Sequence, residues 1–149
     1  MNNLGFTIVE LMIVLTIIGI IMLIVVPDLA SLGGTYRIQV EANKIAQDIR
    51  LTQQLAVVKG YDHVFELNMN ENYYIVRSRN LLDGIEKVEH IDKSVSVLSC
   101  NFDSEAQYKV LKFSPTSIPG RTGHIELVDS FGNKKVINVA VGSGRVQIK

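Results

Sequence analysis

The sequence predicts an α+β fold in which a long N-terminal helix packs on an antiparallel β-sheet head. Three observations lead to this prediction. Residues 6–26 form an almost uninterrupted apolar run, residues 35–59 repeat apolar side chains at helical spacing, and the segments after Gly60 alternate apolar and polar residues. The chain has 149 residues, which suits one modest domain and an appendage.

The apolar run predicts a membrane-spanning helix. It covers 21 residues, Phe6 to Val26, and at about 1.5 Å per residue it reaches roughly 30 Å, the thickness of a bilayer core. A cleaved secretory signal is the competing interpretation. It needs a basic leader and a small-residue cleavage site, whereas residues 1–5 contain no Lys or Arg and the run ends in Val-Val-Pro-Asp. A retained helix fits better.

Glu10 is the one charged side chain between Met1 and Asp28. A carboxylate within a membrane span is costly, so such residues usually have a function and a partner. The chain offers no Lys or Arg before Arg37, so the sequence does not supply a cation nearby. The alternative is a side chain that snorkels to the membrane interface.

Residues 5–12, GFTIVELM, resemble the N-terminal motif of type IV prepilins and type II secretion pseudopilins. This resemblance implies that a membrane peptidase cuts after Gly5 and methylates the new N-terminal residue, Phe6. It also implies that Glu10 of one subunit approaches the Phe6 amine of another during assembly. Pro27 matches a family proline at the end of the span, where it would bend the helix. The family usually has a basic residue just before the glycine, and Asn2-Asn3-Leu4 departs from that pattern, which weakens the orientation signal.

Downstream of the span, the Gly33-Gly34 pair predicts an interruption of the helix. The helical pattern then returns and ends before Gly60, a suitable C-cap. The side chains expected to pack on the sheet are Ile38, Ala42, Ile45, Ile49, Thr52 and Ala56.

The remainder predicts short strands joined by turns. The expected strands are 63–67, 73–77, 88–91, 95–98, 108–113, 124–128, 136–141 and 146–148, with turns at 68–72 and 130–133 and a loop at 114–123. We therefore expect a leader at 1–5, a transmembrane and assembly helix at 6–27, an amphipathic head helix at 28–60 and a β-rich head at 61–149.

The head sequence also carries a resemblance. The order Phe113-Ser-Pro-Thr, then residues 120–127 (GRTGHIEL), Gly132 and residues 142–146 (GSGRV) is similar to minor pseudopilins of the GspH/FimT type, including Gram-positive competence pseudopilins. A major pilin stays open, because the N-terminal motif is shared.

Some relatives take part in DNA uptake, which makes DNA binding an alternative function. Residues 101–149 carry seven Lys/Arg and four Asp/Glu, a net charge of +3, although the whole chain has a net charge of zero. The candidate DNA contacts are Arg121, Lys134, Lys135 and Arg145. Only Arg145 lies near the final glycine motif, and no aromatic residues for base stacking alternate with these cations.

The sequence contains no motif for catalysis, metal or cofactor binding. His63, His90 and His124 are scattered, and the single cysteine, Cys100, excludes an intrachain disulfide. We therefore expect no enzymatic activity, no metal and no cofactor.

The expected function is that of a minor subunit near the tip of a type IV pilus, a type II secretion pseudopilus or a competence pseudopilus. The expected partners are the prepilin peptidase, other pilin or pseudopilin subunits and the cytoplasmic membrane, with DNA as an open alternative. The chain would be a single-pass cytoplasmic membrane protein with its head outside the cytoplasm, and would then enter the filament. A plain anchored domain that never assembles is the remaining alternative.

Overall fold

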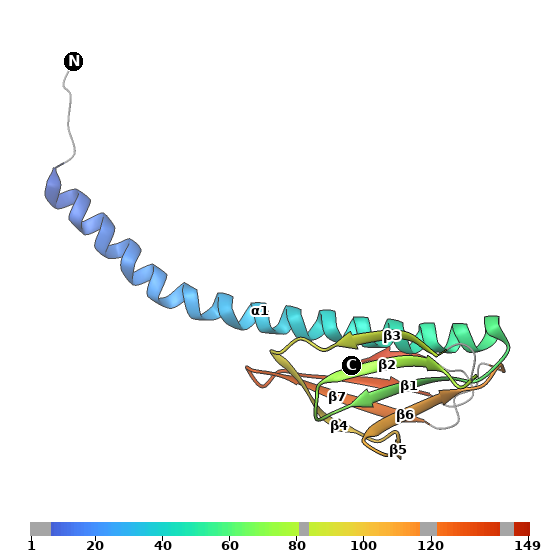
Figure 1. Cartoon of the computed structure of the whole chain (residues 1–149). Helices are drawn as coiled ribbons and strands as arrows, with labels where there is room; N and C mark the ends of the chain where they lie inside the picture. Colours follow the sequence, from blue (N-terminus) through green and yellow to red (C-terminus); the bar gives the residue numbers. More distant parts are fainter. Residues whose placement is uncertain (1–6, 81–83, 117–121, 141–144) are drawn as a thin grey trace. The chain divides into compact units, whose positions relative to one another are not determined.

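The computed structural model of the chain describes residues 7–80, 84–116, 122–140 and 145–149, and the side chains of residues 24–33 lie outside the description. The chain divides into two compact units, residues 1–33 and residues 34–149. Its elements in chain order are α1 (Ile8–Lys59), β1 (His63–Asn68), β2 (Tyr73–Ser78), β3 (Ile85–His90), β4 (Val95–Cys100), β5 (Asp103–Glu105), β6 (Tyr108–Phe113), β7 (Gly123–Asp129), β8 (Lys134–Val139) and β9 (Val146–Ile148) (Figure 1). The α+β prediction is confirmed.

Within the second unit, α1 buries the apolar stripe that the sequence predicts. Its members are fully buried: Ile38, Ala42, Ile45, Ile49, Thr52 and Ala56. The helix ends where expected, since Gly60 has φ +76° and its N–H donates to the Ala56 carbonyl at 3.1 Å. A glycine accepts this left-handed conformation without the penalty that a Cβ would bring.

The expected interruption at Gly33-Gly34 is wrong, because the helical backbone continues through both residues. A glycine inside a helix costs about 1 kcal/mol relative to alanine. Gly34 nevertheless has a packing role, since a Cβ there would collide with the Phe131 ring and with the Asp129 carboxylate. Pro27 also lies within the helical backbone of α1, and its predicted bend stays a prediction.

The strands form two antiparallel sheets rather than one. Sheet A has the order β3-β2-β1-β6-β5, and sheet B has the order β4-β7-β8-β9. The two expected turns join β1 to β2 and β7 to β8. In the first, the Asn68 side chain accepts from the N–H groups of Asn70 and Glu71 at 3.0 and 3.1 Å, which fixes an Asx turn. In the second, Asp129 accepts from the N–H groups of Phe131 and Asn133 at 2.9 and 2.8 Å.

Three predicted strands have bounds that differ by two residues or more in the structure, and one further strand is absent from the prediction. β4 ends at Cys100 rather than at residue 98. The predicted strand at 88–91 corresponds to β3, which begins three residues earlier, at Ile85, and ends one residue earlier, at His90. β8 occupies Lys134–Val139 rather than 136–141, and Val141 lies outside the described residues. β5, with the sequence Asp-Ser-Glu, is absent from the prediction because it has no apolar residue to reveal it.

The core of the head lies where α1 meets the inner faces of both sheets. The stripe of α1 joins one cluster with Phe65 and Leu67 of β1 and with Ile125 and Leu127 of β7. Each large side chain buried in this way contributes about 1.5–3 kcal/mol. α1 also covers part of the edge of sheet B, because Arg50 Nη2 donates to the Val146 carbonyl of β9 at 2.9 Å.

Gly123 and Phe102 provide a test of this packing. Phe102 is 4% exposed, and a Cβ at Gly123 would collide with its ring. We expect Gly123→Ala to lower the free energy of unfolding by about 1–3 kcal/mol, because overpacking displaces a buried ring. In a Phe102→Ala background the same substitution should cost far less. Urea denaturation of the two single variants and the double variant measures this, and an equal cost of Gly123→Ala in both backgrounds would refute the contact.

Candidate functional site

Glu10 closes the first turn of α1. Its Oε2 accepts hydrogen bonds from the Thr7 N–H at 2.8 Å and from the Thr7 hydroxyl at 2.9 Å. In return, the Thr7 hydroxyl oxygen accepts from the Glu10 N–H at 3.3 Å. Thr7 and Glu10 therefore form a capping box, in which a Thr before the helix and a Glu three residues later satisfy each other's N–H groups. The sequence itself contains the Thr-x-x-Glu signature of this capping box.

The capping box occupies only one oxygen of the carboxylate. Glu10 Oε1 makes no hydrogen bond with any residue that the structure describes. The carboxylate can therefore accept a further donor without giving up the contacts with Thr7. Gly5 and Phe6, the residues of the predicted cleavage point, lie outside the described part of the chain.

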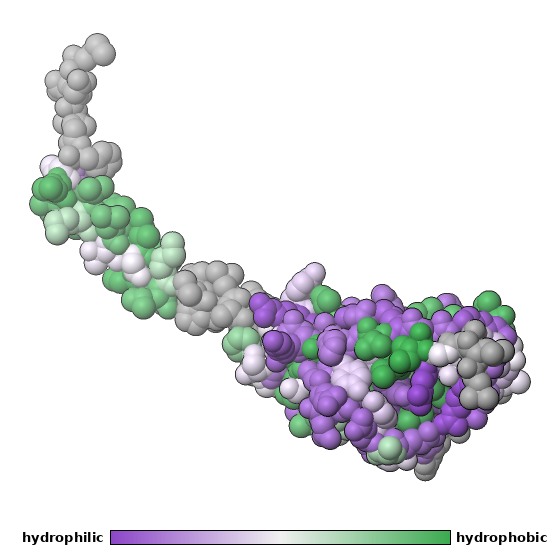
Figure 2. All heavy atoms as spheres, in the orientation of Figure 1, coloured by the Kyte–Doolittle hydropathy of each residue, from purple (hydrophilic) through white to green (hydrophobic). Residues whose placement is uncertain are grey.

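The helix surface around Glu10 is apolar. Between Ile8 and Leu23 the large hydrophobic side chains are about half exposed or more, and the first unit shows this as a continuous hydrophobic surface (Figure 2). A shallow groove on this surface is lined by Val9, Met12, Ile13, Thr16 and Ile17. Thr16 interrupts it little, since its hydroxyl donates to the Met12 carbonyl at 2.8 Å. Within the described residues, no helix meets both the length and the hydropathy of a membrane span.

Lys134 and Lys135, two of the candidate DNA contacts, do not share a surface. Lys134 and Lys135 are neighbours on β8, and successive strand residues point to opposite faces of a sheet. Lys134 is also paired with Glu126, with 3.1 Å between Nζ and Oε1. Arg145 is exposed just before β9, and Arg121 lies outside the described residues. Because phosphate binding needs several cations on one face, this arrangement does not favour DNA binding by the described set.

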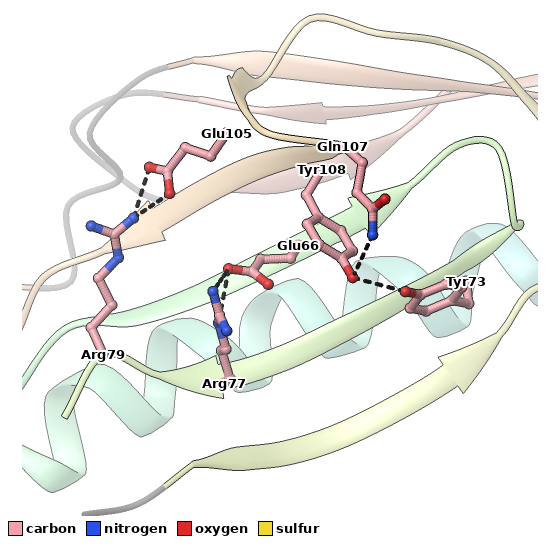
Figure 3. Close-up of polar contacts among 7 residues, drawn as sticks. All are labelled: Glu66, Tyr73, Arg77, Arg79, Glu105, Gln107 and Tyr108. Carbon is pink, nitrogen blue, oxygen red and sulfur yellow. Dashed lines mark hydrogen bonds and ion pairs between the residues drawn. The ribbon is translucent and has the colours of Figure 1, made fainter. Parts of the chain in front are cut away.

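The outer face of sheet A, which lies away from the core, carries more basic residues (Figure 3). Arg77 Nη2 lies 2.7 Å from Oε1 of Glu66, whose side chain is 2% exposed. Arg79 Nη2 lies 2.6 Å from Oε2 of Glu105. Both arginines are thus neutralised by carboxylates, so these two residues do not form a positive surface.

A tyrosine pair lies on the same face. The hydroxyls of Tyr73 and Tyr108 are 2.9 Å apart, and the Gln107 amide donates to the Tyr108 hydroxyl at 3.2 Å (Figure 3). The Tyr73 ring also lies beside the His90 ring, with 5.6 Å between centroids. The pair connects β2 with β6 across the end of the sheet.

A second set of charges joins α1 to β3. Lys87 Nζ lies 2.9 Å from Asp48 Oδ1, Lys44 Nζ lies 2.7 Å from Glu89 Oε2, and Lys59 Nζ lies 2.6 Å from Glu86 Oε1. Their closest atoms come from the helix on one side and from β3 on the other, so they fasten this strand to α1.

Asp48, which is 5% exposed, also accepts from the Tyr74 hydroxyl at 2.6 Å. Burial is the main reason that the pKa of Tyr74 is raised, and the carboxylate beside it adds to the effect. Tyr74 therefore stays a neutral donor, and the buried carboxylate keeps two partners.

Neither a metal site nor a reactive thiol is found in the part of the chain that the structure describes. It contains no group of His, Cys, Asp and Glu side chains that could hold a metal ion. Cys100 is half-buried, and burial raises the pKa of its thiol to about 11, so the thiol stays protonated and unreactive at neutral pH.

The N-terminal segment and the fold each have matches among known proteins. Residues 1–26 match the family model described as the prokaryotic N-terminal methylation motif. The fold is similar to that of the minor pseudopilin EpsH from the type 2 secretion system of Vibrio cholerae, with a TM-score of 0.60 and 10% identity over 74% of this chain and 94% of that chain. It is also similar to the type IV minor pilin FimU of Pseudomonas aeruginosa, with a TM-score of 0.58 and 9% identity over 74% and 87%. A sequence search of the curated proteins finds no match.

Residues 1–26 thus carry an N-terminal methylation motif, and the chain has a pilin-like fold. The fold is similar to that of a minor pseudopilin and of a minor pilin. The resemblance stated from the sequence is thereby confirmed.

His63 provides a pH test of the head. Its side chain is fully buried, and since the Tyr61 carbonyl 3.0 Å from Nδ1 can only accept, Nδ1 carries the proton of the neutral ring. Nε2 has no hydrogen-bond partner among the described residues and lies 3.6 Å from Glu86 Oε1. Burial is the largest influence and lowers the pKa of His63, although the Glu86 carboxylate opposes it.

The unfolded chain binds a proton at His63 more readily than the folded chain does, because the pKa of His63 is lowered in the folded state. The folded state therefore loses stability as the pH falls through about 6.5, the ordinary pKa of histidine, and further below. We expect the free energy of unfolding to fall less steeply between pH 7 and pH 5 in His63→Gln than in the unmodified chain. Urea denaturation at several pH values measures this. An NMR titration of the His63 ring with a midpoint above 6.5 would contradict it.

Proposed function

We propose that the chain is cut after Gly5 by a prepilin peptidase, is N-methylated at Phe6, and assembles as a minor subunit of a type IV pilus or a type II secretion pseudopilus, close to its tip. The methylation motif over residues 1–26, with Glu10 inside it, is the observation that carries this proposal. The pilin-like fold of the head supports it. The proposed role is structural rather than enzymatic.

Cleavage would create the cation that the apolar run lacks. The new amine on Phe6 would lie next to Thr7, whose N–H and hydroxyl already bond Glu10 Oε2. Glu10 Oε1 makes no hydrogen bond with a described residue and could accept from an amine of a neighbouring subunit. In a low dielectric, two opposite charges gain much from pairing, because each alone would be costly.

The proposed location follows from the same segment. The apolar surface between Ile8 and Leu23 would hold the chain in the cytoplasmic membrane until assembly, and the groove along Val9, Ile13 and Ile17 would then receive the helices of other subunits. The head would face away from the cytoplasm. The partners are thus the peptidase, the membrane and other pilin-like subunits.

The capping box provides a matched pair of variants for the test. Gln at the third helical position can also complete a capping box, so Glu10→Gln keeps the hydrogen bonds with Thr7 and removes only the charge. Glu10→Ala removes both. If the charge is what assembly requires, both variants should reduce incorporation into sheared filaments by at least about tenfold, because a lone amine would stay unpaired in the membrane.

Thr7→Ala is the control. It weakens the cap by about 1 kcal/mol and leaves the Glu10 charge in place, so its incorporation should stay close to that of the unmodified chain. Immunoblots of filament and membrane fractions measure the ratio. Normal incorporation of Glu10→Gln, together with a defect in Thr7→Ala, would mean that Glu10 acts only as a helix cap.

A further inference from the structure

The capping box lies beside the bond that the proposed function assigns to the peptidase. Thr7 is the N-cap, and Ile8 is the first residue of α1. Phe6, whose amine cleavage would free, directly precedes Thr7 in the sequence. A helix that began only two residues earlier would reach the bond between Gly5 and Phe6, so the start of α1 decides how that bond is presented.

The capping box and a longer helix need the same N–H group. The Glu10 N–H donates to the Thr7 hydroxyl oxygen at 3.3 Å, and the Thr7 N–H donates to Glu10 Oε2 at 2.8 Å. In a longer helix the Glu10 N–H would donate to the Phe6 carbonyl instead, because each helical N–H bonds the carbonyl four residues earlier. Among the described residues, the first bond of that kind joins the Leu11 N–H to the Thr7 carbonyl at 3.2 Å. Thr7 therefore ends the helix.

An apolar environment gives this cap a larger effect than water would. The large hydrophobic side chains from Ile8 to Leu23 are about half exposed or more, which suits lipid. An unsatisfied N–H group is costly in lipid, so a helix without a cap gains by extending toward the interface, where water meets its first N–H groups. Asn2, Asn3 and Gly5 are poor helix formers, so the composition of the leader and the cap act in the same direction.

Hydrolysis of a peptide bond requires backbone that the peptidase can reach. Water adds to the Gly5 carbonyl carbon, the bond from this carbon to the Phe6 nitrogen breaks, and the products are a carboxylate on Gly5 and an amine on Phe6. A bond inside a helix has to be unwound first, so its cleavage rate follows the population of the open form. A helix that stops at Thr7 removes this step.

We propose that Thr7 and Glu10 position the chain for processing, because their capping box stops α1 before the bond that the peptidase cuts. This inference rests on the proposed function and adds a second role to Glu10. The side chain of Glu10 serves processing through its hydrogen bonds with Thr7, and its charge serves assembly. The two roles are separable, since Gln retains the hydrogen bonds and lacks the charge.

Three variants of Thr7 test the cap against direct recognition of this side chain by the peptidase. Ser and Asn are good N-caps of different shape, whereas Val has the shape of Thr but cannot cap. The full chain in non-ionic detergent is mixed with membranes that contain a prepilin peptidase, and gel electrophoresis follows the cleavage. We expect initial rates within about twofold of the unmodified chain for Thr7→Ser and Thr7→Asn, and a rate at least about threefold lower for Thr7→Val.

Two other patterns of rates contradict the proposal. A normal rate for Thr7→Val would mean that cleavage does not depend on the cap. A rate for Thr7→Asn as low as that for Thr7→Val would mean that the peptidase recognises the Thr side chain itself. Initial rates are compared because a slowly cut chain still reaches complete cleavage, which is why Thr7→Ala is expected to enter filaments.

The backbone of the uncut chain provides a second readout, which direct recognition by the peptidase would not change. We expect the Cα chemical shift of Phe6, measured by NMR in detergent micelles, to move toward helical values in Thr7→Val and to stay unchanged in Thr7→Asn. Unchanged shifts in both variants would refute the control of the helix start by the cap.

Glu10→Gln separates this inference from the proposed function. We expect its initial cleavage rate to stay within about twofold of the unmodified chain, although it fails to enter filaments. A loss of about threefold or more would mean that processing needs the charge rather than the cap. If the unmodified chain is cut after Gly5 and all Thr7 variants are cut equally fast, only the capping role fails. If the unmodified chain is not cut, the proposed function itself fails.

Discussion

The buried stripe of α1 is the interaction on which the head depends. Ile38, Ala42, Ile45 and Ile49 are fully buried, and side chains of both sheets join the same cluster. Neither sheet has another helix to cover its inner face within the described residues. The stripe therefore joins sheet A and sheet B in one core. The ion pairs between α1 and β3 also hold the outermost strand of sheet A against the same helix.

Much of this fold could be predicted from local patterns. The helical repeat identified the buried residues of α1, and β6 and β9 have the predicted bounds, because period-2 and period-3.6 patterns report which side chains are buried. Local patterns do not report which strands pair. β3 and β4 follow one another in the chain but belong to different sheets, and the all-polar β5 has no apolar signal. Gly34 reads as an interruption of the helix because its contact with Phe131 is distant in sequence.

The candidate site, like the fold, could be predicted only in part from local sequence patterns. The sequence singles out Glu10, because a carboxylate is costly in an apolar segment. Its contact with Thr7 can be predicted only from the Thr-x-x-Glu capping signature. The cap changes the meaning of the residue. A carboxylate that already stabilises the helix start through one oxygen can pair with a cation through the other, so a local and an intermolecular role are compatible. Among the candidate DNA contacts, Lys134 and Lys135 are adjacent in sequence but point to opposite faces of β8.

The central claim is that processing supplies the cation for Glu10. Mass spectrometry of the mature N-terminus, on chain purified from cells that contain a prepilin peptidase, tests this claim most directly. The account predicts a chain that begins at Phe6 and carries one methyl group on its amine. A chain that still begins at Met1, or one that is cut near Pro27, would contradict it.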